Sequence, residues 1–232
     1  MNIPEAWRYD ELHPPGIDYN SSAEAAIYDR RHGQFRDLTA EANLALDALG
    51  VAPGGSLVDL GAGTGTFAIQ AARRGLRVHA VDVSEAMLEV AKQKASEAGV
   101  AVSFHHAGFL TYEHEGAPAD FITTTFAFHH LPDFWKGIAL KRLHAVLRTG
   151  GRLYLRDVIL EEADALDNIA RFNERQAAFG GEPLRMDAEG HFRNEYSTYD
   201  WVMEGLFERA GFQILSRRFE GGVLGTYVCE RQ

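Results

Sequence analysis

Residues 58–67 read VDLGAGTGTF, an apolar run that passes into three glycines at alternate positions, Gly61, Gly63 and Gly65. Glycine loses the most conformational freedom on folding, so three in one turn indicate a left-handed backbone or the close approach of a ligand. The preceding run SLVDL (56–60) is typical of a strand, and TGTFAIQAARRG (64–75) has helical spacing. The stretch therefore predicts a strand, a tight turn and a helix.

The same alternation of strand and helix continues along the chain. Further strands are predicted at 77–83, 102–109, 121–128 and 152–160, and helices at 84–99 and 133–151. After a helix at 197–212, strands at 213–219 and 225–230 are close enough to form an antiparallel hairpin. Alternation of this kind predicts an α/β fold: a doubly wound, Rossmann-like sheet of seven strands, mostly parallel, with an antiparallel last strand.

The organisation that we expect is a single domain with four parts. Residues 1–45 form a helical N-terminal cap or lid, and 46–160 the ligand-binding core. Residues 161–198 are a polar, helix-prone insertion on the substrate side, and 199–232 hold the last helix and the hairpin. The substrate is expected to be selected by the first and third parts.

Composition narrows the class of partner. The chain has 232 residues and a formal net charge of -10, which argues against a nucleic-acid backbone as the main partner and favours a small-molecule substrate. It has no apolar run long enough for a membrane span and no secretory signal in MNIPEAWRYDELHPPG, so a cytoplasmic protein is expected. The single cysteine, Cys229, excludes a disulfide framework within the chain. The sequence does not decide whether the chain forms a homodimer.

The spacing of the glycines narrows the ligand. In an open parallel sheet, ligands bind outside the carboxyl ends of the strands, where the next helix offers unpaired N–H donors. The pattern here is G-x-G-x-G, and Thr66 stands where a dinucleotide fingerprint has its third glycine. Asp82 ends the second strand, where a carboxylate can accept hydrogen bonds from both hydroxyls of a ribose. These features together predict a nucleoside cofactor.

Four motifs in order between residues 54 and 158 resemble those of the class I S-adenosylmethionine-dependent methyltransferases. They read VDLGAGTGTFAIQAA (58–72), VHAVDVSEAMLEVA (78–91), ADFITTTFAFHHLPD (119–133) and LHAVLRTGGRLYLRD (143–157), and GTYVCE (225–230) resembles the family's last antiparallel strand. The stretch HHLPD is similar to the small-molecule subgroup typified by quinone-biosynthesis methyltransferases. The resemblance implies S-adenosylmethionine as the methyl donor and S-adenosylhomocysteine as the product.

The resemblance also implies roles for single residues. Those next to the cofactor would be Gly61, Ala62 and Gly63 along its methionine part, Asp82 at the ribose, Val83 and Met87 at the adenine, and Thr125 and Phe126 near the sulfonium. Asp59 resembles the acid of the first motif, which organises the loop. The stretch AIYDRRHGQF (26–35) resembles the helix that closes over the cofactor, so Tyr28, with Tyr19 and His32, would belong to a lid; simple packing of these aromatic rings against the sheet is the alternative.

One position departs from the family pattern. The family often reads Gly-Asp-Phe-Leu after the third strand, and the Asp accepts a hydrogen bond from the adenine amino group. This chain has Ala107-Gly108-Phe109-Leu110, without that carboxylate. We therefore expect adenine to be recognised by backbone groups at Gly108 or by apolar contact with Phe109.

A sulfonium is already an activated methyl donor, so no metal is expected and the main requirement is alignment of the reacting atoms. His129 and His130 follow the fourth strand, and His130 is the preferred general base; the alternative is that both imidazoles cap the next helix or bind the backbone. Asp157 is expected either to bind a substrate amine or hydroxyl or to pair with Arg156. His191 and Glu195 are expected in a loop, which argues against a metal site there.

Three functions are weighed against each other. The leading hypothesis is methyl transfer to an unidentified small molecule, with O-, N- or C-methylation open. A non-catalytic or regulatory module that binds S-adenosylmethionine is the first alternative, because of Gly108. A nucleotide-dependent oxidoreductase is the second, and Thr66 counts against it.

Overall fold

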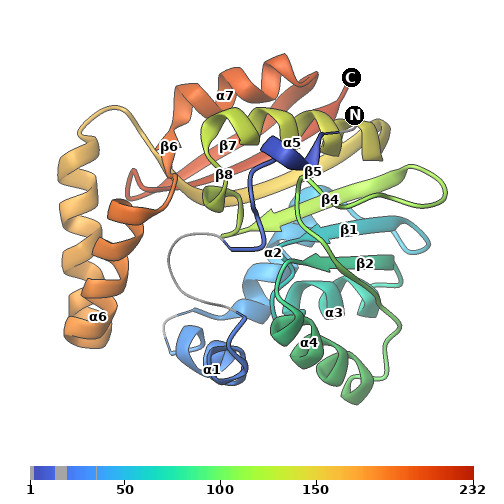
Figure 1. Cartoon of the computed structure of the whole chain (residues 1–232), viewed down its shortest axis with the longest axis horizontal. Helices are drawn as coiled ribbons and strands as arrows, with labels where there is room; N and C mark the ends of the chain where they lie inside the picture. Colours follow the sequence, from blue (N-terminus) through green and yellow to red (C-terminus); the bar gives the residue numbers. More distant parts are fainter. Residues whose placement is uncertain (1–2, 14–19, 35) are drawn as a thin grey trace.

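Strand β1 (Ser56–Leu60), which leads into the glycine turn, lies inside the sheet with all five of its residues buried. The computed structural model describes residues 3–13, 20–34 and 36–232. The other strands are β2 (Arg77–Asp82), β3 (Ser103–His106), β4 (Ala119–Thr125), β5 (Leu147–Leu160), β6 (Thr198–Tyr199), β7 (Phe212–Glu220) and β8 (Leu224–Arg231). Their order is β3-β2-β1-β4-β5-β8-β7, and β6 pairs with the end of β5 (Figure 1).

The topology confirms the predicted α/β fold class. Neighbours from β3 to β5 pair in parallel, whereas β8 is antiparallel to both β5 and β7. The predicted hairpin of the last two strands is therefore confirmed. Within the described part of the chain, the two-residue strand β6 is the element that the pattern of residues did not predict, because two residues carry no periodicity.

The order of the strands reverses beside β1. The chain runs from β1 outward through β2 to β3, then returns to the other side of β1 with β4 and β5. Connections therefore diverge between the carboxyl ends of β1 and β4, which is where open α/β sheets bind their ligands. The glycine turn begins at this point.

Helices cover both faces of the sheet, because consecutive strand residues point to opposite sides. Leu57 packs with residues of α2 and α3, while its neighbour Val58 packs in the cluster that contains residues of α5 and α7. The helices are α1 (Ser22–His32), α2 (Leu38–Leu49), α3 (Thr66–Arg73), α4 (Glu85–Glu97), α5 (Asp133–Val146), α6 (Ala165–Asn194) and α7 (Asp200–Arg209), with 3₁₀ turns η1 (Glu5–Trp7) and η2 (Phe128–His130).

Several predicted boundaries differ from the structure. The helix predicted at 133–151 ends at Val146, and residues 147–151 already belong to β5. Residues 126–128 leave β4 and enter η2. The loop predicted at His191 is wrong: His191 lies in the last turn of α6, because Gly190 is tolerated inside a helix that the rest of the segment favours.

Helix α6 extends away from the sheet as a bent arm (Figure 1). Its bend lies at Gly180 and Gly181, whose backbone angles are not helical, and Pro183 follows. The arm brings its C-terminal end back toward the carboxyl ends of the strands, because Tyr196 N–H donates to the carbonyl of His129 at 2.9 Å. Among the described residues, no helix is both long and apolar enough to cross a bilayer.

Candidate functional site

The glycine turn adopts a backbone that favours glycine at each of its three positions. Gly61, Gly63 and Gly65 have φ angles of +72°, +52° and +75°. The N–H groups of Gly61 and Ala62 both donate to the carbonyl of Val81, at 2.9 and 3.0 Å, and hold the turn against β2. A Cβ at Gly61 would lie 2.3 Å from that of Ala127, so the turn is also packed closely against the segment after β4.

Asp82, at the end of β2, braces the same turn. Its Oδ2 accepts a hydrogen bond from Gly63 N–H at 2.7 Å, and its Oδ1 accepts one from Ser84 N–H at 2.8 Å. Burial raises the pKa of this carboxyl above its ordinary value. The side chain nevertheless reaches a cavity at the strand ends, so it can accept hydrogen bonds from a ligand there.

The cavity has a volume of about 280 Å³ and lies at the ends of β1, β2 and β4. Residues from the first three of the four sequence motifs meet around it, together with Gly108 and Phe109 after β3 and Tyr28 from α1. The predicted site residues in its lining are Tyr28, Gly61, Gly63, Asp82, Val83, Met87, Gly108, Phe109, Thr125, Phe126 and His130. Asp59 and Ala62 line a smaller adjoining hollow of about 80 Å³, which shares Gly61, Gly63 and Phe126 with the first.

A carboxylate that the sequence analysis did not foresee stands beside Gly108. A Cβ built on Gly108 would lie 2.3 Å from Cδ of Glu11 and 2.4 Å from its Oε2. The Glu11 carboxylate accepts from Leu110 N–H at 3.0 Å and from Thr111 Oγ1 at 2.7 Å, and it lines the cavity. Glu11 therefore occupies the volume that the side chain of an Asp at position 108 would take, and no local motif signals this.

Helix α1 is attached directly to the glycine turn. Thr64 Oγ1 donates to Asp29 Oδ1 at 2.5 Å, and Lys94 Nζ from α4 donates to the other oxygen of Asp29 at 2.5 Å. Tyr28, next to Asp29, faces the cavity, and its ring lies 4.2 Å from that of His32. Tyr19, also predicted for a lid, lies outside the described residues.

Phe126 has a strained backbone at the edge of the cavity. Its φ is +53°, a region that residues with a Cβ seldom adopt, and its N–H donates to the carbonyl of Arg156 at 2.9 Å. The guanidinium of Arg36 lies 4.2 Å from the centroid of its ring. Arg156 also pairs with Glu220 at 3.2 Å, and the Asp157 carboxylate contacts His129, so the structure does not support the alternative that Asp157 pairs with Arg156.

Asp157 lies behind the cavity wall, with 2% of its surface exposed. Its Oδ2 accepts from the N–H groups of Phe128 and His129, and its Oδ1 lies 2.5 Å from Nδ1 of His129. Burial opposes ionisation of Asp157, but His129 outweighs it and lowers the pKa to about 2. Asp157 therefore fixes η2 and the ring of His129, and contact of Asp157 with a substrate stays a prediction.

The neighbouring residues His129 and His130 differ in burial and in charge. His129 is buried, whereas His130 lines the cavity. Burial opposes a charge on His129, but the carboxylates of Asp157 and Glu195 raise its pKa to about 9. Burial, together with the neighbouring His129, lowers the pKa of His130 to about 4, so its imidazole is neutral at neutral pH.

Asp59 is a buried acid directly before the turn. Its Oδ1 accepts from Thr123 Oγ1 at 2.9 Å, while its Oδ2 has no hydrogen-bond partner among the described residues. Burial, with a smaller contribution from the charge of Asp82, raises the pKa of Asp59 from 3.8 to about 7. Between these two values the folded chain binds a proton that the unfolded chain has lost, so stability decreases as the pH rises.

The variant Asp59→Asn is expected to remove this pH dependence while keeping the acceptor for Thr123. We expect its free energy of unfolding to exceed that of the wild type by roughly 2–4 kcal/mol at pH 8 and to match it near pH 4. Urea unfolding at both pH values measures the difference, in which the titration of all other groups cancels. An equal difference at the two pH values would show that Asp59 does not titrate in this range.

Residues 57–151 match the family model described as a methyltransferase domain. The chain is 30% identical over 196 residues to an uncharacterized methyltransferase from Geobacillus thermodenitrificans, and the match covers 84% of each chain. Another, from Bacillus anthracis, is 29% identical over 164 residues, which cover 71% of this chain and 72% of the relative.

Solved structures share the fold at lower identity. Magnesium protoporphyrin IX methyltransferase from Synechocystis, with bound S-adenosylhomocysteine, aligns with a TM-score of 0.66 and 18% identity over 92% of this chain and 96% of its own. The [4+2]-cyclase SpnF aligns with a TM-score of 0.67 and 14% identity, over 94% and 97%. The two differ in reaction, so the fold alone does not define the chemistry.

Proposed function

We propose that this chain, which belongs to the class I S-adenosylmethionine-dependent methyltransferases, binds S-adenosylmethionine in the cavity at the strand ends and methylates a small-molecule acceptor. The observation that carries the proposal is the cavity itself, where the glycine turn, Asp82 and the Glu11–Gly108 pair surround one space. The small-molecule class is supported by the stretch HHLPD (129–133) and by the net charge of -10.

The residues present fit such a cofactor. A Cβ built on Gly63 would meet no atom within 4 Å, so the backbone there faces open space that a ligand can approach. Asp82 would accept from the ribose hydroxyls, while Val83 and Met87 would pack against the base. When bound, S-adenosylmethionine supplies the methyl group, and S-adenosylhomocysteine is the product.

The remaining residues prepare the transfer. Helix α1, held to the turn by Asp29, would cover the methionine side and exclude water, and Thr125 and Phe126 would form the wall next to the methyl group. His130 faces the same space with a neutral imidazole, which can accept a proton or a hydrogen bond from the acceptor. Alignment of the acceptor would be the chain's main contribution to the rate.

Calorimetric titration with S-adenosylmethionine and, separately, with NAD tests the cofactor. We expect binding of the first with a stoichiometry of about one per chain, and binding of NAD alone would overturn the proposal. Incubation of the protein with methyl-labelled S-adenosylmethionine and a panel of phenols, amines and carboxylic acids then tests the reaction. Label that enters an acceptor together with S-adenosylhomocysteine supports methyl transfer; binding without transfer to any acceptor favours a non-catalytic module.

Glu11 would read the adenine amino group in place of the acid missing at position 108. Its carboxylate lies beside Gly108 and lines the cavity. Glu11→Gln keeps the size of the side chain but replaces one acceptor oxygen by a donor. We expect binding of S-adenosylhomocysteine to weaken by about ten- to a hundredfold, because a hydrogen bond to a charged group contributes roughly 1.5–3 kcal/mol.

A base exchange distinguishes recognition of the adenine from a structural effect. The inosine analogue of S-adenosylhomocysteine has an oxygen where adenine has its amino group, so the wild type should bind it more weakly. Glu11→Gln should narrow or reverse that preference. Glu5→Gln, the same exchange on an exposed residue of η1, is the matched control and should bind both ligands as the wild type does. An unchanged preference in Glu11→Gln would contradict the assignment.

A further inference from the structure

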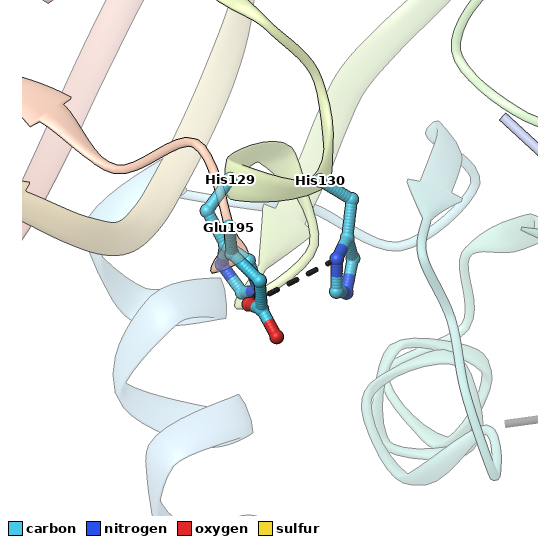
Figure 2. Close-up of side chains that lie close together, drawn as sticks. All are labelled: His129, His130 and Glu195. Carbon is cyan, nitrogen blue, oxygen red and sulfur yellow. Dashed lines mark ion pairs between the residues drawn. The ribbon is translucent and has the colours of Figure 1, made fainter. Parts of the chain in front are cut away.

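Three side chains that can ligate a metal meet where η2 faces the end of α6. Figure 2 shows His129 and His130, from neighbouring positions of η2, on either side of the space next to Glu195. One ligand atom from each of the three lies within 4.8 Å of the others. We propose that His129, His130 and Glu195 bind a divalent first-row transition-metal ion beside the site of methyl transfer. The binding itself does not depend on the proposed function, but its position in a reaction does.

The separations of the ligand atoms fit an ion. Nε2 of His129 lies 3.0 Å from Oε2 of Glu195, and Nδ1 of His130 lies 4.0 Å from the same oxygen. With metal–ligand bonds of about 2.1 Å, adjacent ligands of an octahedral ion are about 3.0 Å apart and opposite ligands about 4.2 Å apart. Both separations to Glu195 therefore lie within a few tenths of an ångström of these values, on the order of ordinary thermal displacements, and all three ligand atoms lie within 4.8 Å of one another.

Two of the proposed ligands, His129 and Glu195, have further polar contacts that fix their positions. Nδ1 of His129 lies 2.5 Å from Asp157, which directs its Nε2 toward Glu195. Nδ1 of His191 lies 2.6 Å from Oε2 of Glu195, and its Nε2 lies 2.7 Å from the hydroxyl of Ser197. Metal-ligating histidines almost always have the other ring nitrogen bound to a carboxylate, a carbonyl or water, and ligating carboxylates are themselves hydrogen-bonded. Asp157 and His191 supply both kinds of support.

The charges of the cluster match a divalent ion. Asp157 and Glu195 are two carboxylates whose side chains are 3% and 10% exposed. Buried charges are costly unless opposite charges compensate them. Without an ion, the charge of His129 compensates part of this negative charge. A divalent ion ligated by neutral imidazoles would displace the proton of His129 and balance both carboxylates. Two imidazoles and one carboxylate favour ions such as Fe²⁺, Mn²⁺, Co²⁺ or Zn²⁺, whereas Mg²⁺ and Ca²⁺ prefer sites made of oxygen ligands.

The site would face the acceptor, because His130 also lines the cavity. Three protein ligands leave positions on the ion open to an oxygen of the acceptor. The ion would orient that oxygen and lower the pKa of a bound hydroxyl, so that its proton leaves to solvent before the oxygen–carbon bond forms. His130 would then act through the ion in place of accepting the proton itself. The acceptor class that fits is a molecule with a hydroxyl at the methylated position.

The test is a titration of chelator-treated, untagged protein with Zn²⁺ by calorimetry, with bound metal counted by elemental analysis. A second group of imidazoles, in which His79 Nδ1 lies 3.0 Å from His105 Nε2, could also take up Zn²⁺. All measurements are therefore made in a His105→Gln background, which removes one of these ligands. We expect one Zn²⁺ per chain, and at least a tenfold loss of affinity in Glu195→Gln and in His130→Gln.

His130→Gln is the safer of the two variants, because its side chain is 20% exposed and its removal leaves no carboxylate without a partner. Far-UV circular dichroism and urea unfolding of the same variants without metal report whether the chain is still folded. Wild-type Zn²⁺ affinity in both variants, or loss of all binding in the His105→Gln background alone, would overturn the metal site. If the protein binds S-adenosylmethionine but not Zn²⁺, the metal site is contradicted and the proposed function stands. If it binds Zn²⁺ but not S-adenosylmethionine, only the proposed function is contradicted.

Discussion

Asp82→Ala is expected to weaken binding of S-adenosylhomocysteine by about a hundred- to ten-thousandfold, since two hydrogen bonds to a charged acceptor contribute roughly 1.5–3 kcal/mol each. The carboxylate lies at the end of β2 and reaches the cavity. The carboxylate is also buried, so water competes little with the donors that hydrogen-bond to it. Isothermal titration of the purified variant measures the change.

The design must separate the ribose from the turn, because Asp82 also accepts from Gly63 and Ser84 N–H groups. The 2′-deoxy analogue of S-adenosylhomocysteine lacks one of the two hydroxyls. The wild type should bind this analogue more weakly than the full ligand, and Asp82→Ala should bind the two alike. A variant that still prefers the hydroxyl would show that Asp82 affects binding only through the turn.

Asp120→Ala is a matched control at the opposite end of the sheet. Asp120 likewise accepts from a backbone N–H, that of Ser56 at 2.8 Å, and it also pairs with Arg148. The control should lower the stability of the fold without changing the affinity for the ligand. If both variants lost ligand affinity equally, general destabilisation would account for the result.

Gly63→Ala should mainly lose affinity for the ligand, whereas Gly61→Ala should mainly lose stability of the fold. At Gly63, an added Cβ meets no atom within 4 Å of the chain, so the loss of stability is limited to the left-handed backbone, about 1–2 kcal/mol. The added methyl group would project into the space that the ligand occupies. We expect the affinity for S-adenosylhomocysteine to fall at least about tenfold, which corresponds to a loss of about 1.4 kcal/mol of binding free energy.

At Gly61, the added Cβ would lie 2.3 Å from that of Ala127, so the backbone around it must move. We expect the free energy of unfolding to decrease by about 3 kcal/mol, from overpacking and the left-handed backbone together. Gly99→Ala is the control for both variants: its φ is +65°, and an added Cβ there meets nothing within 4 Å. Urea unfolding and titration should show that Gly99→Ala matches Gly63→Ala in stability and the wild type in affinity. Equal affinity of Gly63→Ala and wild type would contradict the position of the ligand.

The parts of the fold that the sequence predicts are those with local patterns. The β1–turn–α3 unit, the alternation of strands and helices, and the final hairpin each rest on periodicity or turn residues within about 15 positions. Most of the predicted site residues also reach one cavity, since parallel strands end at the same edge of a sheet, whereas Asp59 and Ala62 line the adjoining hollow and Asp157 lies behind the wall. Long-range pairings carry no such signal: Glu11 meets Leu110 across 99 positions, and Asp157 meets His129 across 28.

The loop predicted at His191 was wrong for a related reason, although the surrounding segment was correctly predicted to be helix-prone. The polar context and Gly190 suggested a loop at His191, but the bent arm continues as helix and places His191 2.6 Å from Glu195. The expected loop at His191 and Glu195 argued against a metal site there. Their partner His129 belongs to η2, 66 positions before Glu195, which no spacing rule connects.

Glu11 has a consequence for how relatives of this chain are compared. Aligned residue by residue, position 108 scores as a lost acid, and a reader of the alignment would infer a weakened or abandoned cofactor site. In the folded chain a carboxylate lies in the same few ångströms, contributed by a segment that an alignment of the core motifs leaves out. On the role that we propose for Glu11, the carboxylate is kept at the same place in the fold while its position in the sequence differs. Cofactor sites in this fold are therefore better compared by the chemical groups that surround the cavity than by the residue types at aligned positions.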